Sequence, residues 1–232
     1  PVTTAADTVL QPLLAADPGA PMITHYDLEA PSRVELSVTS TANWAAKIAG
    51  LLRDELGVTP GDVVLCDLPA HWLTAGTLLG VWWAGAEVAT GAARSPTEPV
   101  VVITVADRLD QHPTDVETLL MTTDPMGRPL DAAGIDVPLG VTDLAEACRI
   151  HPDEFIPSGA GPHALDGSGV DGLADPALRG RALVAGRERR DIVGVLARVF
   201  ASGGTAVLVT GADADNPAVA DVAATERTTL TA

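Results

Sequence analysis

The chain has 232 residues, 47% of them hydrophobic, which is enough to fill the core of one large α/β domain or two small ones. Its 31 acidic and 14 basic residues give a formal net charge of -17, which repels phosphate backbones and anionic lipid headgroups. We therefore do not expect the protein to bind nucleic acids or membrane surfaces.

The N-terminal stretch, PVTTAADTVLQPLLAADPGAP, has no basic region and no long apolar region, which argues against secretion. The most apolar window, LLGVWWAGAEVA, is interrupted by Glu87 well before the roughly 20 residues that a membrane span needs. Cys66 and Cys148 are too far apart for a CxxC metal clamp or a disulfide framework. We expect a soluble, cytoplasmic protein with reduced thiols.

The first strongly predicted helix covers residues 41–56, where apolar side chains recur on one face at helical spacing. Ser40 or Thr41 is the predicted N-cap, and Gly57 suits the left-handed residue that closes a helix. A Pro-Gly turn follows. The apolar run VVLCDL from Val63 then predicts a strand that is buried on both faces.

Pro69 ends this strand, and the run HWLTAGTLLGVWWAG is apolar nearly all round until Gly85, which predicts a buried helix. Strands are predicted next, at residues 86–91 and, more strongly, at residues 99–105. This alternation of helix and strand predicts a parallel sheet covered on both faces.

The rest of the chain shows the same alternation around one long interruption, residues 156–176, which has no periodicity. We predict a strand at 116–123, a helix at 142–155 that starts at Thr142 or Asp143, a strand at 182–186, a helix at 189–200, a strand at 205–211 and a short helix at 216–229. The predicted organisation is an N-terminal arm or helix (1–22), a first α/β part (23–156), a Gly/Pro-rich linker or loop (157–180) and a second, smaller α/β part packed on the first (181–232).

The order of helix, GVTPGD, strand, Pro-containing turn, apolar helix and AGAEV is similar to the N-terminal part of the AMP-binding superfamily, the adenylate-forming acyl-CoA synthetases and their relatives. This match runs from about Ile23 to Gly91. A second segment, LARVFASGGTAVLV, resembles a helix-to-strand passage of the same superfamily. The chain also looks like a short bacterial group of unassigned function within it. The resemblance implies a three-layer αβα fold with a largely parallel sheet.

The chemistry of that superfamily has no counterpart at the expected positions. Its phosphate-binding loop, T-S-G-T-T-G-x-P-K-G, surrounds phosphate oxygens with backbone NH groups and hydroxyls and adds a lysine. No such string occurs here, and the one lysine, Lys47, lies inside the first helix. The Gly-rich segment IPSGAGPHALDGSGVDG stands where the loop is expected, but it carries Asp166 and Asp171 and no Lys or Arg. The Y-G-x-T-E motif and the lid lysine are not found either, so no catalytic residue and no cofactor site carries over.

The sequence therefore favours a truncated AMP-binding-like domain without adenylation activity, which binds a small ligand or a partner. Two alternatives stay open. One is an active or vestigial ATP- or acyl-adenylate-binding enzyme, whose pocket would be lined by His71, Trp72 and the SGAGPH segment. The other is a protein-protein interaction module, either a homo-oligomer or a partner of a true synthetase.

His71 and Trp72 are the candidate ligand-pocket residues, because they follow a predicted strand at the carboxyl edge of an open α/β sheet, where ligands usually bind. The competing interpretation is a solvent-touching histidine at a helix start. Residues 167–172 fit GxGxxG but lack the preceding strand and following helix that a dinucleotide site needs. The five histidines never fall at a metal-ligand spacing, so no metal site is predicted.

Overall fold

Two five-stranded sheets organise the chain. The computed structural model describes residues 2–91, 97–186 and 191–231. Sheet A has the strand order β10-β8-β9-β1-β2, and sheet B has the order β4-β3-β5-β6-β7. The strands are β1 (Pro21–Asp27), β2 (Ser32–Ser37), β3 (Val63–Cys66), β4 (Glu87–Ala89), β5 (Val101–Thr104), β6 (Glu117–Leu120), β7 (Thr142–Asp143), β8 (Arg181–Ala185), β9 (Thr205–Thr210) and β10 (Leu230–Thr231). Of the described pairings only β1 with β2 is antiparallel.

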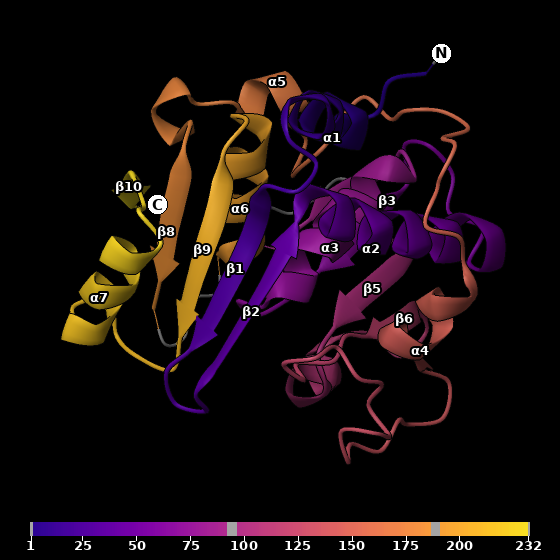
Figure 1. Cartoon of the computed structure of the whole chain (residues 1–232). Coiled ribbons are helices and arrows are strands. Elements are labelled where there is room, and N and C mark those ends of the chain that lie inside the picture. The colour runs from indigo at the N-terminus through magenta and orange to yellow at the C-terminus, as the bar shows by residue number, and fades with distance from the viewer. Residues whose placement is uncertain (1, 92–96, 187–190, 232) are drawn as a thin grey trace.

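Helices lie between the sheets and on the outer face of sheet A. They are α1 (Ala5–Ala16), α2 (Val38–Gly50), α3 (Trp72–Trp83), α4 (Leu144–Ala147), α5 (Val170–Leu173), α6 (Ile192–Ala201) and α7 (Pro217–Thr225), with short turns η1 (Leu51–Glu55), η2 (Ala106–Gln111), η3 (Cys148–Ile150) and η4 (Pro176–Leu178). Figure 1 shows α2 and α3 between the two groups of strands and α7 at the far side of sheet A.

One main core joins the two sheets through these central helices. It includes apolar side chains of α2, α3 and α6, together with inward-facing residues of β1, β8 and β9 from sheet A and of β3, β5 and β6 from sheet B. A smaller core lies under α7, where Val219 and Val222 pack on Leu183, Val207 and Val209. Sheet A is thus covered by helices on both faces, and the α/β class with parallel strands is confirmed. The strands are divided between two sheets: β9 pairs with β1 on one side and with β8 on the other, and none of the three pairs with β3.

The predicted helix at 41–56 begins earlier than expected and changes its winding near its end. Ser37, rather than Ser40 or Thr41, is the N-cap of α2, and its hydroxyl accepts from the Ser40 backbone nitrogen at 3.1 Å. The last turn, η1, is π-helical. Gly57 then adopts φ +68°, which agrees with its predicted closing role.

The apolar helix α3 is buried along its length, as its sequence predicts. Two glycines let it approach α2 closely: a Cβ at Gly76 would lie 3.1 Å from Trp44 Cβ, and a Cβ at Gly80 would lie 2.8 Å from Ile48 Cβ. Small residues at these positions therefore set the spacing of the helices that separate the sheets.

The predicted helix at 142–155 is much shorter in the structure. Thr142 and Asp143 belong to β7, and Asp143 caps α4 by accepting from the Ala145 backbone nitrogen at 2.8 Å. The chain tightens into η3 and leaves helical geometry at His151, which has ψ 150°. His151 precedes Pro152, and a residue before proline is driven out of the α region by steric conflict with the proline ring.

The other elements predicted from the sequence are present in the structure as β3, β4, β5, β6, α3, β8, α6, β9 and α7. Arg189 and Arg190, the first two residues of the helix predicted at 189–200, lie outside the described residues. Residues 5–16 form α1, with a capping box between Thr4 and Asp7. Sheet A combines β1 and β2 from the predicted first part with β8, β9 and β10 from the second. The division at residues 22, 156 and 180 stays a prediction.

Candidate functional site

The Gly-rich segment that stands where a phosphate loop is expected is attached to sheet B by its backbone. Gly161 donates its N–H to the Gly85 carbonyl at 2.9 Å, and Trp82 Nε1 donates to the Ala164 carbonyl at 2.7 Å. A Cβ at Gly85 would lie 2.6 Å from the Gly159 carbonyl oxygen. The absence of side chains at these glycines therefore permits the close approach of the two backbones. Because the Gly161 N–H is already hydrogen-bonded, it is not available to an anion.

The GxGxxG stretch within this segment also makes internal contacts. Gly167 donates its N–H to the Glu87 carboxylate, and Asp166 accepts from the Thr90 nitrogen at 3.0 Å and from its hydroxyl at 2.8 Å. The helix that follows, α5, has only four residues. A dinucleotide-binding loop opens a longer helix that packs on the sheet, which the four residues of α5 do not provide.

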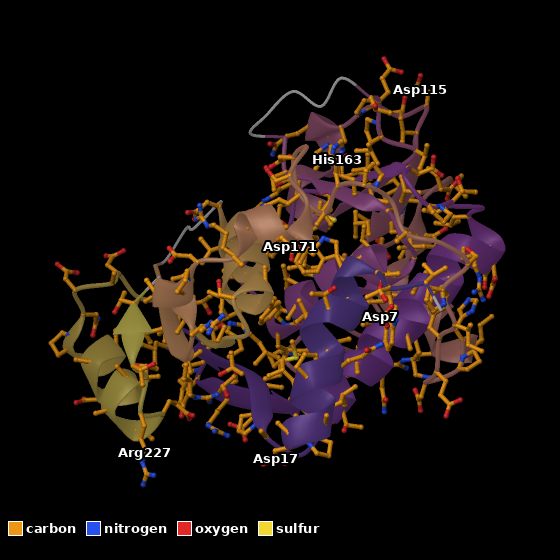
Figure 2. The ribbon with its side chains drawn as sticks, turned by 90° about the horizontal axis from the view of Figure 1, so that it is seen from above. Asp7, Asp17, Asp115, His163, Asp171 and Arg227 are labelled. Carbon is orange, nitrogen blue, oxygen red and sulfur yellow. The ribbon has the colours of Figure 1, made fainter. Side chains whose placement is uncertain are left out.

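A cleft of about 210 Å³ separates this segment from the start of α1. Thr3, Thr4, Thr8, His163 and Asp171 are among its lining residues, and no lysine or arginine is. Figure 2 shows His163 and Asp171 on the segment that runs beside α1. The cleft offers hydroxyls, an imidazole and a carboxylate, which lack the fixed positive charge that strong phosphate sites use.

The structure places His71 between the two sheets. It is the N-cap of α3, where its Nδ1 accepts from the Leu73 backbone nitrogen at 3.2 Å. His71 is 2% exposed, and its other nitrogen, Nε2, makes no hydrogen bond to any residue that the structure describes. The ring of His25 on β1 lies 5.3 Å away in an edge-to-face arrangement. The pair therefore joins sheet A to the carboxyl edge of sheet B.

Both imidazoles are neutral at physiological pH. Burial lowers the pKa of His71 to about 3, and the neighbouring His25 lowers it further, while the Asp124 backbone and carboxylate act in the opposite direction. Burial likewise lowers the pKa of His25 to about 4, against the attraction of Asp27. His25 Nε2 also shares a hydrogen bond of 2.9 Å with the Thr210 hydroxyl.

Trp72 is held in the core by contacts on both sides of its ring. It is 2% exposed, donates from Nε1 to the Pro125 carbonyl at 3.0 Å, and stacks edge-to-face with Trp44 at 5.4 Å. A Cβ at Gly127 would lie 2.8 Å from the ring. The structure thus brings His71 and Trp72 together at the predicted edge, but inside the molecule. A role for them in contacting a ligand stays a prediction.

A second polar cluster lies at the same edge and was not predicted. Asp67 follows β3 and accepts from Arg108 Nη1 at 2.7 Å through one carboxylate oxygen, while the other lies 3.1 Å from His112 Nε2. Arg108 belongs to η2, which follows β5, and His112 is its C-cap. The position of Asp67 immediately after a buried parallel strand is the sequence signal that could have found this cluster.

Six of the ten basic side chains in the described residues are paired with acids, whereas Arg149, Arg179, Arg198 and Arg227 are not. Because each guanidinium or ammonium in such a pair faces a carboxylate, its charge is compensated locally. The pairs are Arg33 and Arg181 with Glu226, Lys47 with Asp153, Arg53 with Asp54, Arg108 with Asp67, and Arg128 with Asp124. Arg94, Arg187, Arg189 and Arg190 lie outside the described residues.

Within residues 2–91, 97–186 and 191–231, no group of three or more His, Cys, Asp or Glu side chains is arranged to hold a metal ion. None of the helices in those same ranges is both long enough and apolar enough to span a membrane.

The fold is similar to part of the fold of acyl-CoA synthetases and related adenylate-forming enzymes. The chain matches an acyl-CoA synthetase from Brucella canis with a TM-score of 0.72 at 16% identity, covering 100% of this chain and 47% of that one. It matches the anthranilate CoA ligase AuaEII, solved in complex with anthranoyl-AMP, with a TM-score of 0.68 at 13% identity, covering 99% and 49%. For an acetoacetyl-CoA synthetase from Streptomyces lividans the TM-score is 0.61 at 17% identity, covering 89% and 38%. The chain thus spans half or less of the length of these structures, and at such identities they share its fold alone.

Sequence comparison gives the narrower identity. No model of a known protein family matches the chain. A protein of Mycobacterium tuberculosis strain H37Rv described as a "TIGR03089 family protein" is 43% identical over 176 residues, which cover 73% of this chain and 69% of that protein. The chain therefore belongs to the TIGR03089 family. The predicted resemblance to adenylate-forming proteins, with a bacterial relative of unassigned function, is confirmed.

Proposed function

We propose that this protein uses the adenylate-forming fold for binding, taking up a small ligand or a partner without forming an adenylate. The observation that carries the proposal is the docking of the Gly-rich segment. Where a phosphate loop is expected from the sequence, the backbone of residues 159–167 is bonded to the Gly85 turn, to β4 and to Glu87. A segment with these bonds has few free NH groups to offer to a triphosphate.

Electrostatics support the same proposal. Adenylation concentrates negative charge at the α-phosphorus, and enzymes stabilise that charge with preorganised donors, cations and Mg²⁺. In the described part of the chain, five arginines and Lys47 have acidic partners within 4 Å. Releasing any of these cations for a phosphate would leave a carboxylate unpaired, at an energetic cost.

The test is an ATP–pyrophosphate exchange assay with a panel of carboxylic acids, together with calorimetry using ATP and Mg²⁺. A known acyl-CoA synthetase serves as the positive control. We expect no exchange above background and no magnesium-dependent ATP binding. Exchange with any acid would overturn the proposal. In that case the triple variant with Gln at Arg187, Arg189 and Arg190 would show whether the undescribed arginines supply the missing charge.

An enzyme that binds ATP or an acyl-adenylate is the second candidate. Its support is the unpaired His71 Nε2, a buried hydrogen-bonding atom at the junction of the sheets that a ligand or a water molecule could satisfy. Calorimetry with AMP and with an acyl-adenylate analogue tests it. Binding that is retained by His163→Asn but lost by His71→Asn would favour this candidate over the first.

Partner binding is the third candidate, and exposed apolar side chains support it. Met126, Ile150 and Ile156 are 74%, 79% and 83% exposed. Apolar side chains of this size on a surface are typical of contact sites when they gather. Light scattering over a range of concentrations tests self-association. A dimer that is lost in Ile156→Lys would support this candidate, and a monomer at all concentrations would remove homo-oligomers from it.

We also infer a cytoplasmic location from the thiols. Cys66 and Cys148 are both free and buried. Burial raises the pKa of Cys148 to about 12 and that of Cys66 further, so both are protonated and unreactive at neutral pH. Cell fractionation of the native host tests this inference.

A further inference from the structure

A surface groove of about 300 Å³ lies beside β6 of sheet B. One wall is the loop that follows η2, and the other is the loop at residues 138–141, with Thr118 of β6 at its base. The volume is at the lower end of the range for small-molecule pockets. Figure 2 shows Asp115, which neighbours the first wall, at the end of the molecule opposite Arg227, so the groove is remote from α7.

Asp67 orients the imidazole of His112, the histidine that lines this groove. His112 lines the groove, and its Nε2 lies 3.1 Å from the Asp67 carboxylate. A carboxylate accepts hydrogen bonds, so Nε2 carries a proton, and in the neutral form of that tautomer Nδ1 is an acceptor. No hydrogen bond joins Nδ1 to any residue in the described ranges. Arg108 holds the same carboxylate at 2.7 Å and keeps it in place.

The other polar groups of the groove are mainly acceptors as well. Asp110 is an exposed carboxylate in the lining, and the Thr118 hydroxyl already donates to the Val116 carbonyl at 3.0 Å. The lining contains no lysine or arginine. Leu109, Val116 and Leu139 supply apolar surface, and the Leu139 side chain is fully exposed in the structure.

From these observations we propose that the groove binds a small primary amine with an apolar body. Its ammonium group donates to His112 Nδ1 and faces Asp110, and its apolar part covers Leu109, Val116 and Leu139. Anions are disfavoured by Asp110 and by the net charge of -17. The site is independent of any adenylate chemistry, because adenosine phosphates and fatty acids carry the opposite charge.

The experiment compares benzylamine with benzoate, which match in size and differ in the sign of their charge. Saturation-transfer NMR at low salt measures their binding to the full chain. We expect benzylamine to bind in the millimolar range, to weaken at least threefold in 0.5 M NaCl, and to outbind benzoate at least tenfold. Equal binding of the two compounds, or no binding of benzylamine, would overturn the proposal.

Two exposed substitutions locate the site without disturbing the fold. Asp110→Asn removes the carboxylate of the groove, and Asp221→Asn makes the same change on α7. We expect at least a threefold loss of benzylamine affinity in the first variant and no loss in the second. A third variant, Leu139→Ala, should also weaken binding, because Leu139 is a wall of the groove. Equal affinity in Asp110→Asn and Asp221→Asn would place the amine elsewhere and refute the groove as its site.

Discussion

Thr104 and Thr77 are both completely buried, but they differ in the hydrogen bonding of their hydroxyl groups. The Thr77 hydroxyl donates to the Leu73 carbonyl at 2.9 Å, whereas the Thr104 hydroxyl on β5 has no hydrogen-bond partner among the described residues. An unsatisfied buried polar group destabilises the folded state, and valine has nearly the same shape as threonine without the hydroxyl. We expect Thr104→Val to raise the free energy of unfolding by up to about 1 kcal/mol. Urea denaturation at pH 7 measures the change.

Thr77→Val is the matched control, because it removes a hydroxyl that is bonded in the folded state. It should lower the free energy of unfolding by about 1 kcal/mol. If both variants lose stability by the same amount, the Thr104 hydroxyl has a partner in solution, such as a bound water molecule.

The residues of the candidate site were predictable only in part. The position of His71 at the carboxyl edge of a strand follows from the local order of Pro69 and the apolar helix. The burial of His71 does not follow from the local sequence, because the ring that packs against it, His25, belongs to β1 in the other sheet. The Asp67 cluster likewise depends on contacts that span 41 and 45 residues. Local periodicity carries no information on such contacts.

At the scale of elements, the Gly85 turn determines how the segment 157–173 is placed. Gly85 has φ +84°, and a Cβ there would lie 2.6 Å from the Gly159 carbonyl oxygen. Gly134 also has a positive φ, +79°, but open space around its Cβ position. We expect Gly134→Ala to cost about 1–2 kcal/mol from backbone strain alone. Gly85→Ala should cost about 1–3 kcal/mol more from the added clash.

Two measurements check the Gly85 prediction. Urea denaturation gives the stability difference between the two alanine variants. Limited proteolysis reports the segment itself, since a displaced segment exposes cleavable backbone. Equal stability and equal cleavage rates in the two variants would show that the close contact with Gly159 does not hold the segment.

Element types were more predictable than element ends. The strands of sheet B follow from short apolar runs, and α3 follows from its continuous apolar surface. The start of α2 was misplaced because Ser37, Ser40 and Thr41 are all competent caps, and only the hydrogen bond to the Ser37 hydroxyl decides between them. The helix at 142–155 was overestimated because its helical spacing continues past the point where Pro152 ends it.

At the scale of the whole molecule, the division into two sheets was not predictable. A helix followed by a strand has the same local sequence pattern whichever sheet the strand joins. The pairing of β1 with β9 also connects residues about 180 positions apart in the chain. The two sheets then meet where His25 and His71 face each other. This junction contains two neutral, buried imidazoles, and it therefore makes the stability of the whole fold sensitive to acid.

The direction of that sensitivity follows from the two histidine pKa values. In the unfolded chain both titrate near the ordinary value of 6.5, whereas in the folded state burial lowers them to about 3 for His71 and about 4 for His25. Between these limits the unfolded chain binds more protons, so stability falls as the pH drops below about 6.5. The loss approaches about 1.4 kcal/mol per pH unit for each histidine. The pKa of Asp124 is lowered to about 2 mainly by Arg128, and the pKa of Glu226 is lowered to about 2 by Tyr26, Arg181 and Arg33. The stability that these carboxylates contribute is therefore lost only at pH values below their ordinary pKa.

His71→Asn separates the junction from other acid effects, since asparagine can still cap α3 but does not titrate in this range. The variant loses packing at every pH, so the informative quantity is the slope of unfolding free energy against pH between 6 and 5. We expect that slope to fall by about half relative to the unsubstituted chain, because one of the two buried imidazoles is gone. His163→Asn makes the same substitution at a histidine whose side chain is 46% exposed and is the matched control. An unaltered slope in His71→Asn would mean that its imidazole finds a proton-accepting partner in the folded state, and that the junction of the sheets is wetter than its geometry indicates.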